Sequence, residues 1–158
     1  MSNFKLTQTG DWAKVRHVLG YKLPKLAPYI MGRIDEYGEL ALEIIKGHIR
    51  SQSLPWTPLS EETVRIKGHS KIYVETGVLS NGLEVKRMGI LGGKNELFIG
   101  FSDGITHESG LTYGQLMVML EYGTIHIPPR PLVRPSFDEV KKIITKDLKP
   151  LIDRYMRR

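Results

Sequence analysis

The sequence contains no cysteine and no long apolar run. The absence of cysteine excludes disulfide bonds, thiolate zinc sites and cysteine nucleophiles. No stretch has the length needed to span a bilayer, and the N-terminus lacks the apolar core of a signal peptide. We therefore expect a protein that is made in the cytoplasm and whose fold depends on side-chain packing alone.

Motifs of catalysis and metal binding are missing as well. The five histidines stand at positions 17, 48, 69, 107 and 126, with no spacing typical of a metal site. No serine lies in a GxSxG motif, and the glycine cluster at 89–93 lacks the Lys-Ser/Thr pair of a phosphate-binding loop. His107 and Glu108 are neighbours in a glycine-flanked loop, but a solvated loop histidine is the commoner case. We predict that the chain is not an enzyme and has no catalytic, cofactor-binding or metal-binding residue.

The composition is that of an ordinary globular domain, with 158 residues of which 41% are hydrophobic and 25% charged. We predict one domain over residues 1–158, with an N-terminal helical extension over about 1–25. The net charge of +6 is compatible with a nucleic acid, a membrane surface or an acidic protein as partner. Residues 130–158 carry nine basic and four acidic side chains, and for this segment a solvated helix face, an acidic partner and DNA all remain open.

Apolar residues at steps of three and four predict several helices. A short amphipathic helix is expected at 11–19, capped by Asp11 and stopped by Gly20, and a long one at about 30–50 after the prolines at 24 and 28. Ser60 caps a short helical turn, and residues 113–122 form a helix that ends at Gly123. A terminal helix follows the prolines at 128–135 and should kink or restart at Pro150.

Two strands are expected at 83–90 and 96–101, where Val, Ile, Leu and Phe are frequent. The Gly-Gly-Lys-Asn segment at 92–95 between them predicts a tight turn. The fold class is therefore α+β, a small antiparallel sheet (hairpin 83–101) packed with a long helix in the N-terminal half and a C-terminal helix.

The most distinctive segment is EYGTIHIPPRPLVRPSFDEV, residues 121–140. Its prolines fix φ and donate no hydrogen bond, so residues 127–131 are expected to be a stiff extended connector that keeps its shape without a hydrogen-bonding neighbour. Arg130 and Arg134 project from it, and Glu121 or an acidic residue of a neighbouring subunit is a candidate partner for them. A rigid loop that simply leads into a helix is the alternative; we favour a contact surface.

This E-Y-G-T element followed by I-P-x-R-P-x-x-R-P-x-F-D resembles the head-tail joining proteins of long-tailed phages, also described as neck or tail-completion proteins. Upstream, P-W-T-P-L-S at 55–60 with Thr63 and Lys67, then E-T-G-V-L-S at 75–80, is similar to the pattern of the related phage virion-morphogenesis proteins. The matching stretches cover about a third of the chain.

The resemblance implies an α+β subunit of a homo-oligomeric ring in the virion neck, between the head connector or head-closure protein and the tail terminator or tail tube. Contact anchors are expected at Tyr122, Arg130, Arg134 and Phe137, with Glu121 beside them. Non-specific contact with packaged DNA is a further expectation. The alternative reading, based on the net charge, is a small basic DNA-binding or assembly-accessory protein.

Overall fold

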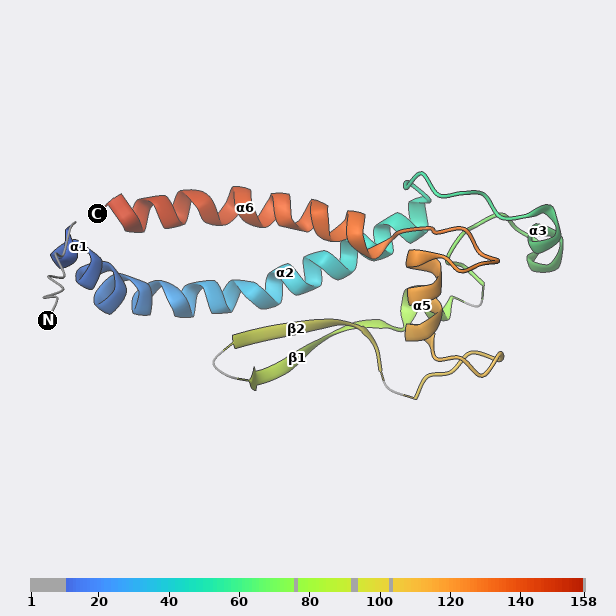
Figure 1. Ribbon diagram of the computed structural model, residues 1–158, viewed down its shortest axis with the longest axis horizontal. Coiled ribbons are helices and arrows are strands. Elements are labelled where there is room, and N and C mark those ends of the chain that lie inside the picture. Colours follow the sequence, from blue (N-terminus) through green and yellow to red (C-terminus); the bar gives the residue numbers. More distant parts are fainter. Residues whose placement is uncertain (1–10, 76, 92–93, 103, 158) are drawn as a thin grey trace, which may run out of the picture.

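The computed structural model describes residues 11–75, 77–91, 94–102 and 104–157 (Figure 1). Its frame consists of two long helices that run side by side in opposite directions, α2 (Leu23–Ser51) and α6 (Val133–Arg157). At 1.5 Å per residue they measure roughly 44 and 38 Å. The predicted α+β class is confirmed: α2 lies between α6 and an antiparallel hairpin, with the short elements gathered at one end.

The predicted N-terminal helix does not stop at Gly20. Helix α1 (Trp12–His17), capped by the Asp11 carboxylate as predicted, continues through a π-helical turn (η1, Val18–Lys22) directly into α2. The expected interruption at the two prolines was therefore wrong. Pro24 lies directly after the π-helical turn and Pro28 one turn later, and the burial of Val18 and Leu26 compensates for the hydrogen bonds that these prolines cannot donate. The part of the predicted extension over residues 1–10 lies outside the described residues.

The hairpin is confirmed, with strands β1 (Leu83–Leu91) and β2 (Lys94–Phe101). Leu83 pairs with Phe101 and Val85 with Ile99, which places the apolar side chains of both strands on the face toward α2. The register shifts between Arg87 and Ile90. The predicted turn glycines at 92 and 93 lie outside the described residues.

Gly38 of α2 allows this hairpin to approach the helix closely. A Cβ atom at this position would lie 2.6 Å from Leu97 Cδ1 and 3.0 Å from Val85 Cγ1. The other two glycines of the predicted helix, Gly32 and Gly47, have no such neighbour within 4 Å. Close packing therefore explains one of the three glycines.

Short helices fill the end of the molecule beyond the hairpin. Ser60 caps α3 (Glu61–Lys67) and Thr112 caps α5 (Tyr113–Tyr122), which ends at Gly123, all as predicted. An additional turn, α4 (Val78–Asn81), precedes β1 and was not predicted. The main core lies under these elements and is formed by Leu42, Ile45, Ile49, Ile72, Tyr73, Leu83, Met117 and Leu132.

The opposite end of the molecule is an arm of two helices, the N-terminal half of α2 and the C-terminal half of α6 (Figure 1). Helix α6 runs through Pro150 to Arg157 as one helix, so of the two predicted alternatives, a kink or a restart, the restart does not occur. The Asp147 carboxylate accepts hydrogen bonds from Tyr37 Oη (2.5 Å) and from the Arg33 guanidinium across the seam. These donors hold the pKa of Asp147 below its ordinary value, while burial raises the pKa of Tyr37. Within the described residues, no helix has the length and apolarity of a membrane span.

Candidate interaction surface

The Glu121 carboxylate caps the N-terminus of α6. Its Oε2 accepts from the backbone N–H groups of Leu132 (2.7 Å) and Val133 (2.8 Å), and Oε1 accepts from Arg134 N (3.0 Å). The first N–H groups of a helix have no partner within the helix, and a negative charge there also interacts favourably with the helix dipole. Glu121 therefore connects the end of α5 to the start of α6, and its expected pairing with an arginine side chain was wrong.

Arg130 is buried, with 5% of its surface exposed. Its Nε donates to the Thr57 carbonyl (2.8 Å) and its Nη2 to the Pro58 carbonyl (3.1 Å). The backbone carbonyl of Arg130 accepts a hydrogen bond from Tyr73 Oη (2.5 Å). Burial and the nearby Glu121 charge raise the pKa of the Tyr73 hydroxyl. Arg130 thus holds the connector to the loop before α3 and, contrary to the sequence prediction, is not an exposed contact anchor.

The connector has no regular secondary structure, and it does not stand alone. Arg130 N donates to the Leu120 carbonyl (2.7 Å), and Trp56 Nε1 donates to the Pro131 carbonyl (2.6 Å). Gly123 starts the turn with φ +76°, and a Cβ atom there would lie 2.8 Å from the Ile127 carbonyl oxygen. The stiffness predicted from the prolines therefore depends on hydrogen-bonding neighbours, which the prediction had excluded.

The other predicted anchors lie on the outside of this braced segment. Tyr122 is 66% and Phe137 46% exposed, and the Arg134 guanidinium lies 5.9 Å above the Tyr122 ring. Val118, one turn before Tyr122 on α5, is 58% exposed, and Phe98 on β2 is 43% exposed. We name Phe98, Val118, Tyr122, Arg134 and Phe137 the aromatic face.

A groove of about 460 Å³ is part of this face. It lies between β2, α5 and the first turns of α6, and Phe98, Val118 and Phe137 are among its walls. The Phe98 ring lies over Gly100, where an added Cβ would be 2.3 Å from the ring Cζ, so this ring position requires the glycine. The face thus combines a hollow with aromatic and arginine side chains, the residue types that dominate binding energy at protein interfaces.

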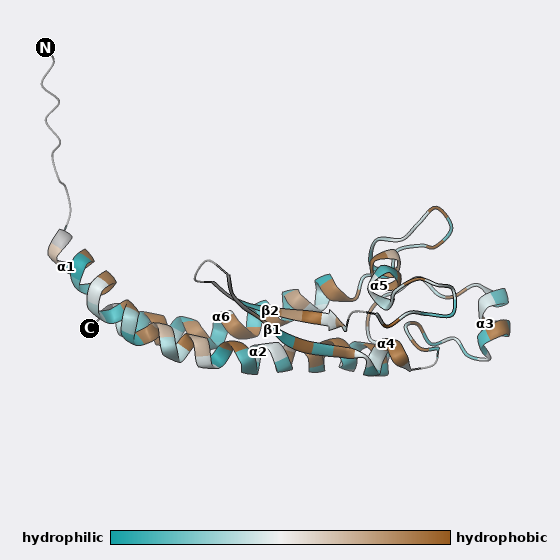
Figure 2. Ribbon diagram, turned by 90° about the horizontal axis from the view of Figure 1, so that it is seen from below, coloured by the Kyte–Doolittle hydropathy of each residue, from teal (hydrophilic) through white to brown (hydrophobic). Residues whose placement is uncertain are grey.

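The molecule exposes more surface than a compact monomer. Its accessible area is 11733 Å², whereas the scaling for compact proteins gives about 8,000 Å² at 18.0 kDa. The elongated shape contributes to this difference, and Figure 2 shows apolar segments alternating with hydrophilic ones along the helices of the arm.

A second hollow, of about 560 Å³, lies between α3, α5 and the connector. Lys67 lines it, and burial lowers the pKa of this lysine. His107, also in its wall, pairs through Nε2 with Glu75 (3.3 Å) and not with its neighbour Glu108. Its Nδ1 lies 2.9 Å from Ser109 Oγ and accepts from Ser109 N (3.1 Å), so the ring closes a local turn and we assign it no catalytic role.

The part of the chain described by the structure contains no group of three or more His, Asp or Glu residues able to hold a metal ion. Comparison with protein-family models, with curated proteins and with solved structures finds no match for this chain. The relationship to phage neck proteins therefore remains a prediction from the sequence motifs.

Sequence reasoning missed Phe98 and Val118 as surface residues. The period of two along β2 would have placed Phe98 on the side opposite Leu97 and Ile99, and Val118 precedes Tyr122 by one helical turn. Both signals were in the sequence, but only the packing of β2 beside α5 brings the two side chains to one groove.

Proposed function

We propose that this chain is a structural subunit of the neck of a tailed bacteriophage, where copies of it form a ring that joins the head connector to the tail. The observation that carries the proposal is the aromatic face, in which Phe98, Val118 and Phe137 line an exposed groove and Tyr122 and Arg134 are exposed outside it on the same two helices, α5 and α6. The assignment to a tailed phage rests on the sequence motifs at residues 55–80 and 121–140, which resemble those of phage neck proteins.

The support matters because a surface that is already ordered loses little entropy on binding. Glu121 and Arg130 fix the connector by five hydrogen bonds from beneath, while Tyr122 and Arg134 remain accessible above it. Contact with a neighbouring subunit would remove water from the arginine that lies over the tyrosine ring, which strengthens a cation–π contact. We therefore retain the predicted docking role for the exposed residues beside the connector, Tyr122 and Arg134.

Side-by-side packing of elongated subunits in a closed ring would cover both the aromatic face and the apolar residues of the arm. A structural role of this kind needs no catalytic group, and we propose that the chain is not an enzyme. Its partners would be copies of itself, the connector or head-closure protein on one side and the tail terminator or tail tube on the other.

The test uses particles made without this chain, which should accumulate as separate full heads and tails in electron micrographs. The wild-type protein should restore joined particles, while Tyr122→Ser/Phe137→Ser should not, although its far-UV circular dichroism and urea unfolding remain those of the wild type. Ile66→Ser is the matched control, since Ile66 is 74% exposed on α3, away from the face. Joined particles with the double variant would contradict the proposed contact, and normal particles without the chain would contradict the proposed function.

A further inference from the structure

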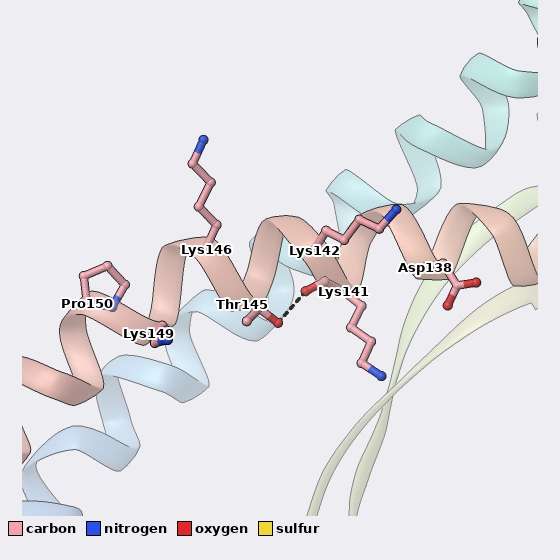
Figure 3. Close-up of a pocket in the computed structure, with 7 residues that line it drawn as sticks. All are labelled: Asp138, Lys141, Lys142, Thr145, Lys146, Lys149 and Pro150. Atoms are coloured by element: carbon pink, nitrogen blue, oxygen red, sulfur yellow. Dashed lines mark hydrogen bonds between the residues drawn. The ribbon is translucent and has the colours of Figure 1, made fainter.

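The outer side of α6 carries a group of lysines that the fold does not use. Lys141, Lys142, Lys146 and Lys149 are all exposed, whereas Val140 of the same helix is buried toward α2. Figure 3 shows Lys142 and Lys146 toward the upper side of the helix, Lys141 projecting from the lower side, and Lys149 seen nearly end-on beside Pro150. We name these four residues the lysine ridge.

No ion pair among the described residues neutralises the charge of the ridge. Among the described residues the ion pairs of lysine and arginine involve Arg33, Arg50, Arg65, Arg87 and Lys86, and none of the ridge lysines. The acidic residue within the ridge, Asp147, points to the seam and binds Tyr37 and Arg33 there. Asp138 lies one turn before Lys141 and Lys142 and lines the same hollow, and Asp153 lies one turn after Lys149, but neither forms an ion pair with a ridge lysine among the described residues.

Stabilisation of the helix does not explain this arrangement. Cations interact favourably with the helix dipole only in the last turn, but Lys141 and Lys142 lie about four turns before the end of α6 at Arg157. Pairs of opposite charge one turn apart would also stabilise the helix, yet the ridge lysines form none among the described residues. The ridge is therefore available for a partner.

We infer that the lysine ridge binds the phosphate backbone of double-stranded DNA without reading its sequence. From Lys141 to Lys149 the helix rises roughly 12 Å, and duplex DNA presents one negative charge per about 1.7 Å of its axis, so phosphates face the ridge whatever its orientation. An acidic protein would need carboxylates at matching positions. Lysine carries a point charge and lacks the planar guanidinium with which arginine recognises the edge of a guanine base. The ridge lysines are therefore suited to contact with DNA phosphates more than with bases.

The inference does not depend on the phage assignment, because it rests on the charge and position of these four side chains alone. If the chain does stand in a phage neck, DNA that leaves the head would be the natural partner, and the ridge would face it. The aromatic face and the lysine ridge lie on different parts of α6, so the two contacts can exist together.

The experiment is a salt titration of the full chain with a fluorescent 20-base-pair duplex, followed by anisotropy. With four phosphate contacts, the logarithm of the binding constant should fall with the logarithm of NaCl concentration with a slope of about −3.6, an affinity loss of about 150-fold between 50 and 200 mM. Lys142→Gln/Lys146→Gln should reduce the slope to about −1.8, equivalent to a loss of about 12-fold. The control variant is Lys46→Gln/Lys71→Gln, which has the same net charge as Lys142→Gln/Lys146→Gln but changes two lysines outside the ridge. Its slope should remain that of the wild type.

Equal slopes for the two double variants, or no binding at 50 mM NaCl, would overturn the inference. Two duplexes of unrelated sequence should bind within roughly a factor of three of each other, and a strong preference for one would contradict backbone binding. Poly-glutamate should compete much less well than unlabelled duplex at equal charge concentration; equal competition would assign the ridge to acidic proteins. Urea unfolding of every variant checks that the substitutions leave the fold intact.

Discussion

Replacement of Glu121 tests whether α6 and the connector are held in place by a single carboxylate. In Glu121→Ala the three N–H groups of Leu132, Val133 and Arg134 lose their acceptor at once, and Leu132 has no exposed surface through which water could replace it. Loss of a helix cap costs about 0.5–2 kcal/mol, and the lost charge at the helix N-terminus adds about 0.3–1 kcal/mol. We expect Glu121→Ala to lower the free energy of unfolding by about 3 kcal/mol once the buried N–H group is included.

Glu121→Gln keeps one oxygen acceptor without the charge, and should lose about half as much. Urea unfolding followed by circular dichroism measures both effects, provided that the variants and the wild type have equal m-values. For a chain of this size the melting temperature of the alanine variant should fall by roughly 6–12 °C. Glu108→Ala is the control, since Glu108 is exposed and makes no described hydrogen bond. A loss for Glu121→Ala within about 0.5 kcal/mol of that control would refute the capping role.

Three further predictions concern packing, pH and the buried arginine. Gly38→Ala should destabilise the protein by about 1 kcal/mol, because the added Cβ meets Leu97 and the cost of overpacking exceeds the gain in helix propensity. Gly32→Ala has open space around the added Cβ and should stabilise the protein by about 1 kcal/mol. Thermal melts compare the two variants, and equal shifts in melting temperature would contradict the close approach of the hairpin to Gly38. The pKa of Asp147 is lowered in the folded state, so its contribution to stability is present above the ordinary value of 3.8 and is lost as the pH falls through the folded pKa. In urea titrations Asp147→Asn should therefore be less stable than the wild type at neutral pH and lose less on acidification, and parallel pH curves would argue against this. Arg130→Met removes two hydrogen bonds from a charged donor and should cost about 2 kcal/mol in urea unfolding, with increased proteolysis of the connector; unchanged stability would show that the connector is held by its prolines alone.

The local elements followed from the sequence because their signals are local. The cap at Thr112 and the glycine at 123 bound α5 at both ends, and the frequency of Val, Ile, Leu and Phe located both strands of the hairpin. The same reasoning placed a break at the prolines before residue 30, which did not occur. Rules for proline describe the isolated helix, while Val18 and Leu26 are held by burial in the folded protein.

The candidate site was only partly within reach of the sequence. Of the residues predicted as contact anchors, Tyr122, Arg134 and Phe137 are exposed, whereas Arg130 and the neighbouring Glu121 bind backbone groups of the fold. An arginine and a glutamate in a proline-rich segment suggest an ion pair, because charged side chains prefer opposite charges. Their actual partners are backbone groups, and those of Arg130 belong to a loop 72–73 residues earlier in the chain.

The sequence by itself determined most of the helical and extended segments, since hydrophobic periodicity, caps and turn glycines act over a few residues. It also determined that positive charge accumulates in the last helix. Only the tertiary structure decided which basic side chains are buried and hydrogen-bonded within the fold and which remain exposed. It also decided which exposed aromatic residues share one groove. The reason is that a side chain's partner depends on which distant backbone arrives beside it, and that arrival is set by the packing of the whole chain, not by the residues on either side.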